Sequence, residues 1–380
     1  MAQVGIMSMQ RIANYGSFLQ AYALKSMLEE QGHDVQFVDY RVGFPVIQDS
    51  SESTNTLTRM VKKGVETFGS RAPLLQKLAF IKHKREYASK YMPLLGISEQ
   101  RNYTPELDCL VIGSDEVFNC IQKNTKVGYS PELFGAQNRA KRVITYAASF
   151  GNTTLQKLQR YDKADEIGMY LSEIDAISVR DTNSGKIVEA LTDKMPKYHL
   201  DPVLVYDYFG KCQFIPEIEV NEKYLILYAY SGRITDSEAK WISAYAKRRG
   251  LKVYAIGGVQ QCADKFIDCS PFEVLAYFKR AEEVITDTFH GTIFSIIAHR
   301  PFVTLIRKSI GTAYGNEEKL SDLLIRLGLA KRSIYDIACA EAVLRHKIVY
   351  SDTDSIIKVQ RQRTNQYLRF NMCCSLSKED

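Results

Sequence analysis

Residues 4–40 read VGIMSMQRIANYGSFLQAYALKSMLEEQGHDVQFVDY, and this stretch decides the fold. Val4–Met9 is an apolar run of the length of a short strand. Residues 17–31 then repeat apolar side chains at helical spacing, and Gly32 stands where a helix C-cap glycine is expected. Val35–Tyr40 is the next apolar run. A strand, a helix and a strand in this order build a parallel sheet with a right-handed crossover.

The same alternation continues along the chain and then restarts. Further strands of the first series are expected at Leu107–Ile112, Arg142–Ala147 and Ala176–Val179. The second series has expected strands at Tyr224–Tyr230, Leu251–Ile256, Val284–Thr286 and Phe302–Ile306. Thr235–Glu238 matches a capping box that opens a helix ending at Arg249. The two series predict an α/β protein with two Rossmann-like, doubly wound domains and an active site in the cleft between them.

The 380 residues exceed what a single core usually holds, which also favours two domains. We predict a first domain over residues 1–210 with a basic helical insertion at about 50–100, and a second domain over 211–345. Residues 346–380 are predicted to form a C-terminal helix and tail that pack back across both domains. The segment from Asp201-Pro202 to about Glu222 is the predicted linker.

Composition excludes several classes of protein. The chain is 45% hydrophobic and 25% charged, as globular proteins are, and its net charge of +6 does not suggest a nucleic-acid binder. Its eight cysteines show no Cys-x-x-Cys pair, so we expect neither a metal site nor a disulfide framework. The N-terminus lacks the features of a signal peptide, and we expect a cytoplasmic location.

Positive charge is concentrated in one segment. Nine basic and two acidic side chains fall between Arg59 and Lys90, among apolar residues at near-helical spacing. Two interpretations stay open. The segment is either a solvated helical insertion or, through residues 57–90, a peripheral contact with an anionic membrane or a lipid-linked phosphate.

The strongest candidate for chemistry is His290, in the stretch ITDTFHGT at residues 285–292. It falls in a turn from a strand into a helix, so an imidazole and the backbone N–H groups near Gly291 and Thr292 are expected together. Such a turn suits a phosphate or carboxylate, and a histidine can deliver a proton near neutral pH. The alternative is a histidine that only caps its own helix.

Three further strand ends carry candidate residues. Asn14, Tyr15 and Gly16 could contact a sugar or could only cap the first helix. Asp115 and Glu116 follow the strand Leu107–Ile112, where either could act as a base, although a helix N-cap by Ser114 or Asp115 is equally consistent with the sequence.

Arg180 is the expected anion clamp, with a local pair to Asp181 as the alternative. The loop at Ser231-Gly232 is a weak additional signal.

Several segments together resemble the polysaccharide pyruvyl transferase family. They are NYGSFLQAYAL at 14–24, DCLVIGSDEVFN at 108–119, YAASFG at 146–151, ISVRD at 177–181, Asp201-Pro202 and TDTFHGTIFS at 286–295. The resemblance implies a GT-B-like arrangement of the two domains. It also implies transfer of an enolpyruvyl-derived group from phosphoenolpyruvate to two sugar hydroxyls, which makes a pyruvate ketal and releases phosphate.

The sequence departs from the family pattern at Thr288. Better-studied branches of the family carry an arginine at this place, two residues before the histidine. Anion binding would then fall to Arg180 and backbone N–H groups, unless Arg307 or Lys308 reaches the site. Thr288 and Ser231 complete the expected donor-binding set.

The prediction is therefore a pyruvyl transferase with catalytic His290, Asp115 and Glu116. Phosphoenolpyruvate is its donor substrate, a sugar or lipid-linked oligosaccharide of a surface or capsular polysaccharide precursor is its acceptor, and no cofactor or nucleic acid is expected. Two alternatives stay open: a GT-B glycosyltransferase that uses a nucleotide sugar, and a non-catalytic protein that binds a sugar or phosphate.

Overall fold

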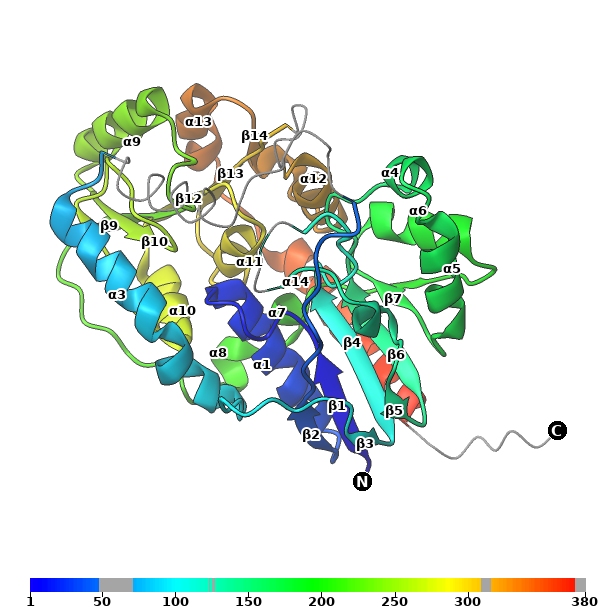
Figure 1. Ribbon diagram of the computed structural model, residues 1–380. Coiled ribbons are helices and arrows are strands. Elements are labelled where there is room, and N and C mark those ends of the chain that lie inside the picture. The colour runs from blue at the N-terminus through cyan, green and yellow to red at the C-terminus, as the bar shows by residue number, and fades with distance from the viewer. Residues whose placement is uncertain (48–70, 123, 125–126, 309–315, 373–380) are drawn as a thin grey trace.

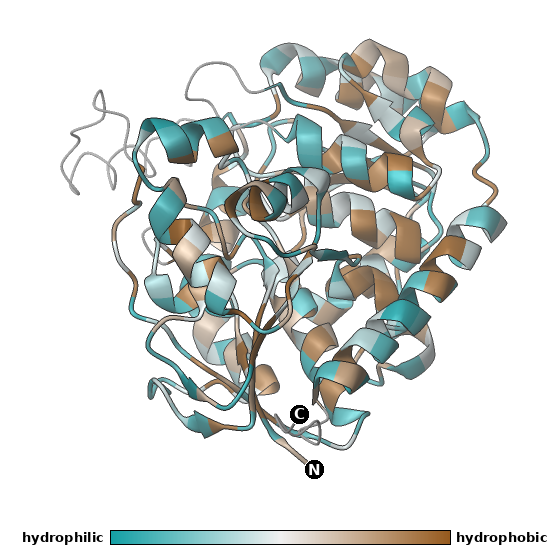
Figure 2. Ribbon diagram, turned by 90° about the vertical axis from the view of Figure 1, so that its right-hand side faces the viewer, coloured by the Kyte–Doolittle hydropathy of each residue, from teal (hydrophilic) through white to brown (hydrophobic). Residues whose placement is uncertain are grey.

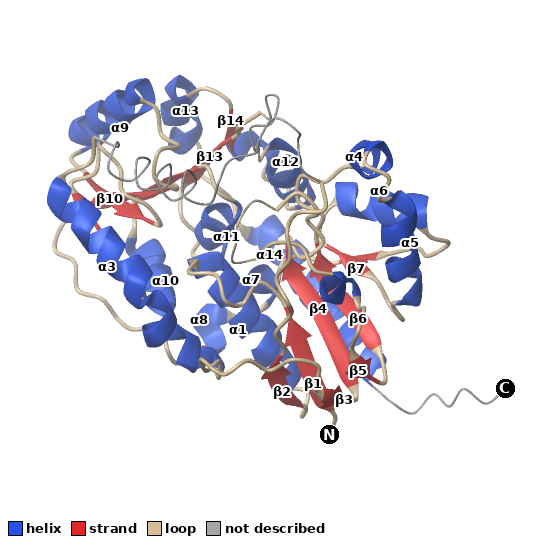
Figure 3. Ribbon diagram, in the orientation of Figure 1, coloured by secondary structure: helices blue, strands red, loops and turns tan. Residues whose placement is uncertain are grey.

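A computed structural model describes residues 1–47, 71–122, 124, 127–308 and 316–372. It contains two six-stranded parallel sheets with helices packed on both (Figures 1 and 3). The fold is therefore α/β, with two Rossmann-like domains, each built on a doubly wound parallel sheet, as predicted. Among the described residues, no helix is both long enough and apolar enough to cross a bilayer.

The first sheet has the order β2-β1-β4-β6-β7-β8, and every pairing in it is parallel. Its strands are β1 (Gln3–Met7), β2 (Asp34–Phe37), β4 (Cys109–Asp115), β6 (Val143–Ala148), β7 (Ser178–Val179) and β8 (Lys197–Tyr198). The helices of this domain include α1 (Tyr15–Glu29), α4 (Leu155–Arg160), α5 (Ala164–Glu173) and α6 (Thr182–Leu191), and a small sheet pairs β3 (Glu106–Leu107) with β5 (Arg139–Ala140). The central strands β4 and β6 are buried along their whole length, because helices cover both of their faces.

The second sheet has the order β11-β10-β9-β12-β13-β14, again all parallel. Its strands are β9 (Tyr224–Tyr228), β10 (Lys252–Ile256), β11 (Lys265–Phe266), β12 (Glu283–Thr286), β13 (Phe302–Leu305) and β14 (Ser333–Ile334). Its helices include α9 (Asp236–Arg249), α10 (Pro271–Arg280), α11 (Phe289–Ile297) and α12 (Glu317–Arg326). The predicted capping box is confirmed, because Thr235 and Glu238 bond each other's backbone at the start of α9.

The segment predicted as a linker is part of the core. Its two short helices are α7 (Pro202–Val205) and α8 (Tyr208–Lys211). The side chains of Val203, Leu204 and Val205 are fully buried. Because α7 packs on α1 and α11, the connection lies between the domains and is not a solvated tether (Figure 1).

The C-terminal part turns back onto the first domain. The predicted C-terminal helix is α14 (Ser351–Met372), and a separate short helix, α13 (Ala340–Arg345), precedes it. In α14, Tyr367 donates its hydroxyl hydrogen to the carbonyl of Thr145 in β6, at 2.9 Å. This helix therefore ties the end of the chain to the first sheet.

The described part of the basic segment forms α3 (Leu74–Tyr91). Although it belongs to the first half of the chain, α3 lies against the second domain (Figure 1). His83 pairs with Asp268 at 2.7 Å, and Gln76 donates to the carbonyl of Ala263.

The surface helices carry both hydrophilic and hydrophobic residues (Figure 2). The basic residues from Arg59 to position 70 lie outside the described residues.

The two sheets have their switch points at comparable places. In the first sheet, the chain leaves β1 in one direction to β2 and later returns on its other side as β4. In the second, β9 has β10 on one side and β12 on the other. Doubly wound folds bind ligands at the carboxyl ends of such strands. The loops after β1, β4, β9 and β12 are therefore where a site is expected.

Candidate active site

His290 lies in the first turn of α11, directly after β12. Thr288 is the N-cap of this helix, and its hydroxyl accepts a hydrogen bond from the Gly291 amide at 2.9 Å. A side chain on Gly291 would overlap the hydroxyl of Thr286, so the turn is tight. The interpretation of His290 as the cap of its own helix is therefore wrong. Its imidazole is left for other contacts.

The Nε2 atom of His290 faces Asp201 of the linker, 3.5 Å from its Oδ2 atom. Asp201 is completely buried, and its Oδ1 atom accepts from the Val203 amide at the start of α7. Burial alone would raise the pKa of Asp201. The interaction with His290, the charge of Arg180 and the Val203 amide outweigh burial, so this pKa lies below its ordinary value. Asp201 is thus an ionised carboxylate facing His290.

Arg180 follows β7 and joins the same cluster. Its Nη1 atom donates to Asp201 at 2.9 Å and lies 3.6 Å from Oδ1 of Asp115. The guanidinium also lies over the ring of Phe289, 4.3 Å from the ring centre. The alternative of a local pair with Asp181 is wrong, because Asp181 caps α6 instead. Two carboxylates already balance the charge of Arg180, which weakens its predicted role as an anion clamp.

Gly16 brings the loop after β1 against the histidine. A side-chain carbon placed on Gly16 would lie 2.1 Å from Nδ1 of His290, a distance that real atoms do not reach. The glycine is therefore required by close packing. One ring nitrogen of His290 faces Asp201, and the other faces this loop.

Asn14 connects the same loop to both domains. Its Oδ1 atom caps α1 by accepting from the Gly16 and Ser17 amides. Its Nδ2 atom donates to the hydroxyl of Tyr230, in the loop after β9, at 2.8 Å. Capping and interdomain contact are thus combined in one side chain. Tyr15 points away from His290, toward Cys269 and His83.

Asp115 ends β4 beside these residues. Its Oδ2 atom accepts from the hydroxyl of Ser17 at 2.9 Å, and its backbone φ of +79° is unusual for a residue with a side chain. The alternative of a helix N-cap by Ser114 or Asp115 is wrong, since β4 leads into a turn in the described chain. The carboxylate of Asp115 lies close to both α1 and Arg180.

Glu116 makes a different kind of contact. Its Oε1 atom lies 2.8 Å from Nζ of Lys319 on α12, and its Oε2 atom accepts from Asn119 at 3.0 Å. Lys319 belongs to the second domain. Glu116 thus takes part in an interdomain ion pair, whereas Asp115 belongs to the cluster around Arg180.

The other residues expected to bind the donor have structural partners. The amide of Gly291 is taken by Thr288, and the amide of Thr292 donates to the Thr288 carbonyl. The hydroxyl of Ser231 accepts from the Val259 amide. The prediction that the Gly291 and Thr292 amides bind an anion is therefore wrong. Both amides already donate to Thr288, one to its hydroxyl and the other to its carbonyl.

Arg307 and Lys308 do not take the place of the missing arginine. Arg307 donates to both carboxylate oxygens of Glu238. The amine of Lys308 lies over the ring of Tyr335. Both contacts are within the second domain.

A family model for polysaccharide pyruvyl transferases matches residues 14–309. The chain belongs to this family. The matched range begins at the cap residue Asn14 and includes Arg180, Asp201 and His290. It thus covers the residues that meet at the cleft.

No curated protein sequence matches the chain significantly. Among solved structures, the glycotransferase of kitacinnamycin is similar over 97% of this chain and 99% of its own, with 10% identity and a TM-score of 0.49. UDP-GlcNAc 2-epimerase from Methanocaldococcus jannaschii is similar over 97% and 99%, with 11% identity and a TM-score of 0.48.

Two residues of this pyruvyl transferase family member were not predicted to act at the site. Asp201 belongs to the Asp-Pro pair of the family pattern and starts the predicted linker, but no role in the site was predicted for it. Arg233, a partly exposed residue of the loop after β9, lies over the ring of Tyr230 at 4.7 Å. Its Nη1 atom is 3.9 Å from the buried carboxylate of Asp287. A basic residue directly after Ser231-Gly232 was the available signal for Arg233.

Proposed function

We propose that this member of the family transfers a pyruvyl group from phosphoenolpyruvate to two hydroxyls of one sugar, in a precursor of a surface polysaccharide. The observation that carries the proposal is the cluster of His290, Asp201 and Arg180, assembled from both domains. It joins a group that can donate a proton, a carboxylate that orients it, and a cation that keeps the carboxylate ionised. Such an arrangement supports general acid chemistry on an anionic substrate.

The proposed step begins with a proton from His290 to the methylene carbon of phosphoenolpyruvate. The central carbon becomes electrophilic, and one sugar hydroxyl adds to it. Phosphate leaves with the electrons of its C–O bond, and the second hydroxyl of the same sugar then adds to close the ketal. Two hydroxyl protons are released, which balance the proton that carbon gains and the one that phosphate carries away.

Asp115 is the proposed acceptor of a hydroxyl proton. Its carboxylate lies at the end of β4, next to Ser17 of the helix that follows the acceptor loop. That loop ends at Asn14, the N-cap of α1, and Tyr15 and Gly16 lie in the first turn of the helix, where Gly16 packs on the imidazole. Since the ring and the loop are in contact, substrate entry requires them to separate.

Arg233 is the proposed cation for the donor. Its side chain is 33% exposed, whereas that of Arg180 is 4% exposed and lies between two carboxylates. Lys319 is nearby on α12 and faces Glu116. An arginine at this place could bind the phosphate in two-point fashion and offset the threonine at position 288.

The deciding experiment incubates purified protein with phosphoenolpyruvate and a panel of glycan acceptors. We expect release of inorganic phosphate together with an acceptor mass gain equal to pyruvic acid minus water. A GT-B glycosyltransferase would instead release a nucleotide from a nucleotide sugar. Substrate recovered unchanged after long incubation would indicate a binding protein.

A contact with an anionic membrane is also proposed for residues 57–90. On α3, Leu74, Leu75 and Leu78 are exposed on the surface, at 62%, 80% and 51%. Lys82 follows Leu78 by one helical turn, and Arg85 follows it by two. An apolar face beside basic residues is suited to the headgroup region of a bilayer.

A further inference from the structure

Helix α12 presents a polar face to the first domain. Its residues 319, 322 and 326 are three and four positions apart, so their side chains lie on the same side of the helix. The Nζ atom of Lys319 lies 2.8 Å from Oε1 of Glu116, which directly follows β4. Asp322 accepts a hydrogen bond from the hydroxyl of Thr182, at the start of α6. Here the two domains are joined by polar side chains that water can also solvate.

Arg326, the third residue of this face, reaches the candidate site itself. Its Nη1 atom donates to the backbone carbonyl of Arg180 at 2.6 Å. The side chain of Arg180 is bonded to Asp201 and lies next to Asp115, so α12 contacts the same strand ends that carry the cluster around His290. The residues of this face, called the α12 stripe below, are Lys319, Asp322 and Arg326. Movement of the α12 stripe away from the first domain would open the cleft at that cluster.

The rest of α12 is fixed to the second domain. The buried apolar residues of the helix are Leu320, Leu323 and Leu324. At its start, Asn316 donates to the carbonyl of Asp287 at 2.6 Å and accepts from the amide of Arg307 at 2.7 Å. The helix therefore moves with the second domain, and the α12 stripe is the part of it that the first domain contacts.

Elsewhere the domains meet through apolar contacts. Phe272 of α10 packs edge to face on Phe18 and Tyr22 of α1, with ring centres 5.5 and 4.9 Å apart. The short helix α7 contacts both α1 and α11, and one cluster of buried apolar residues extends across both domains. Separating these surfaces would expose apolar area to water, which is unfavourable in proportion to that area. Breaking the partly exposed ion pair between Lys319 and Glu116 costs less, because each charge is solvated again.

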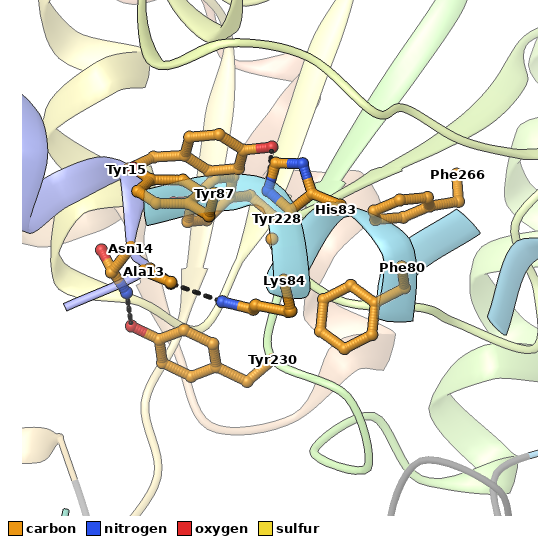
Figure 4. Close-up of a pocket in the computed structure, with 11 residues that line it drawn as sticks. Ala13, Asn14, Tyr15, Phe80, His83, Lys84, Tyr87, Tyr228, Tyr230 and Phe266 are labelled. Atoms are coloured by element: carbon orange, nitrogen blue, oxygen red, sulfur yellow. Dashed lines mark hydrogen bonds between the residues drawn. The ribbon is translucent and has the colours of Figure 1, made fainter. Parts of the chain in front are cut away.

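The contacts of α1 also change from polar to apolar along the helix. At its N-cap, Asn14 donates to the hydroxyl of Tyr230 at 2.8 Å (Figure 4). The pocket beside this contact, which α3 closes on one side, has a volume of about 10 Å³, room for about one water molecule. Phe18 and Tyr22 follow Asn14 by one and two turns and make the apolar contacts. The domains are thus closed against each other near the site, through contacts that are easier to break than those further along α1.

The groups proposed to act on the substrate are nearly inaccessible in this closed arrangement. The side chain of His290 is 11% exposed, and that of Arg180 is 4% exposed. Gly16 packs so closely on the imidazole that even a methyl group does not fit between them. A substrate can reach these groups only if the two domains separate.

We infer that the α12 stripe is a latch. The domains open when its contacts with the first domain break, while the apolar packing of α1 on α7 and α10 remains and acts as the hinge. The inference rests on the proposed function only for the identity of the substrate that enters. The opening itself is measurable without turnover.

Chemical modification of two histidines measures the opening. Diethyl pyrocarbonate acylates accessible imidazoles, and tandem mass spectrometry gives the rate at each histidine. His290 is the probe, and His299, which is 48% exposed, is the control within the same protein. Lys319→Met combined with Arg326→Met removes two charges of the α12 stripe. This variant should raise the rate at His290 at least threefold and leave the rate at His299 unchanged.

Lys163→Met is the matched control variant. Lys163 pairs with Glu166 at 2.9 Å within the first domain, so its loss removes a charge and an ion pair without touching the cleft. It should leave the rates at His290 and His299 at the parent's values.

A covalent bridge tests the latch in the opposite direction. Thr182→Cys combined with Asp322→Cys replaces a hydrogen-bonded pair with two thiols. The background carries Cys339→Ser, Cys373→Ser and Cys374→Ser, which limits other disulfides. After oxidation, His290 in the bridged protein should react at least tenfold more slowly than in the same protein after reduction. The rate at His299 should be the same in both.

Two outcomes would overturn the inference. One is equal reactivity of His290 in the bridged and the reduced protein, and the other is an unchanged rate at His290 in the α12 stripe variant. Phosphate release from phosphoenolpyruvate separates the latch from the proposed function. A latch that controls access to His290 in a protein that releases no phosphate would retain the inference and reject the proposed function. Full phosphate release by the bridged protein would do the opposite.

Discussion

The Oδ2 atom of Asp201 lies 3.5 Å from the Nε2 atom of His290, although Asp201 comes after the last strand of the first sheet and His290 comes after β12 of the second. The contact exists only because α7 is buried between the domains and holds Asp201 at its N-cap. Asp201 is therefore the residue through which domain packing fixes the orientation of the imidazole. The proposed chemistry depends on that orientation.

Asp201→Asn tests this relationship. The amide keeps the shape but removes the negative charge beside His290, and a general acid typically contributes 10²–10⁴-fold to a rate. We expect kcat to fall about 10²-fold, with a smaller change in KM for phosphoenolpyruvate, measured by phosphate release. Asp207→Asn in the same linker is the control, since Asp207 caps α8 and faces Arg361 rather than His290. Equal activity of Asp201→Asn and the parent would contradict the role of Asp201.

Gly16→Ala tests the packing of the acceptor loop on the ring. The added methyl group would lie 2.1 Å from Nδ1 of His290, so the ring or the loop must move. Overpacking typically costs about 1–3 kcal/mol of stability. We expect kcat/KM to fall at least tenfold. Ala23→Gly in the same helix lowers stability without adding an atom near His290, and it should keep its activity. If both variants lose activity in proportion to stability, the contact has no special part in the reaction.

Much of the fold follows from local pattern. The apolar runs, the capping box at Thr235–Glu238 and the glycines after helices are features of neighbouring residues, so they predict two alternating series of strands and helices. The cluster around His290 is different. Asp201 and Arg180 belong to this cluster although they are far from His290 in the sequence. The two carboxylates that neutralise Arg180 reach it only because the fold brings the ends of separate strands together.

The position of α3 was also beyond prediction. Its basic and apolar pattern indicates a helix, but periodicity does not say which domain the helix covers. The pair between His83 and Asp268, which attaches α3 to the second domain, joins residues 185 positions apart. The pocket described above is a consequence of that attachment.

Arg233→Gln tests the proposed donor cation. Glutamine retains hydrogen bonding but loses the charge and the fork of arginine. Hydrogen bonds to charged groups contribute about 1.5–3 kcal/mol, so KM for phosphoenolpyruvate should rise roughly 10- to 100-fold with little change in kcat. Arg248→Gln, on the exposed side of α9, is the control. A KM equal to that of the parent would indicate that Arg180, and not Arg233, binds the donor.

The pKa shifts of Asp287 and Asp201 have opposite directions, so we expect opposite effects of pH on stability at these two residues. Burial raises the pKa of Asp287, against the nearby Arg233 and Arg307, so its ionised form is unfavourable in the folded protein. This loss of stability begins as pH rises above the ordinary pKa of 3.8 and is complete above the pKa that Asp287 has in the folded protein. Asp287→Asn should therefore gain stability relative to the parent between pH 4 and 8.

The pKa of Asp201 is lowered, so its stabilisation is present above its ordinary value of 3.8 and is lost as pH falls through the folded pKa. Asp201→Asn should accordingly lose stability relative to the parent over the same rise in pH. Urea unfolding at several pH values measures both differences. Curves that run parallel to the parent's at every pH would show that neither carboxylate has the environment described here.

The exposed leucines of α3 lead to a prediction about membranes. If the helix meets anionic headgroups, the protein should sediment with vesicles containing phosphatidylglycerol and should be released as salt rises from roughly 0.05 to 0.5 M, because screening weakens surface attraction. Leu75→Ser with Leu78→Ser should weaken binding further, since both side chains are exposed apolar groups. Ile325→Ser on α12 is a matched control, because Ile325 is 66% exposed on another surface. Binding that ignores salt, or no binding at all, would make α3 a solvated helix whose part in the protein is the pocket wall alone.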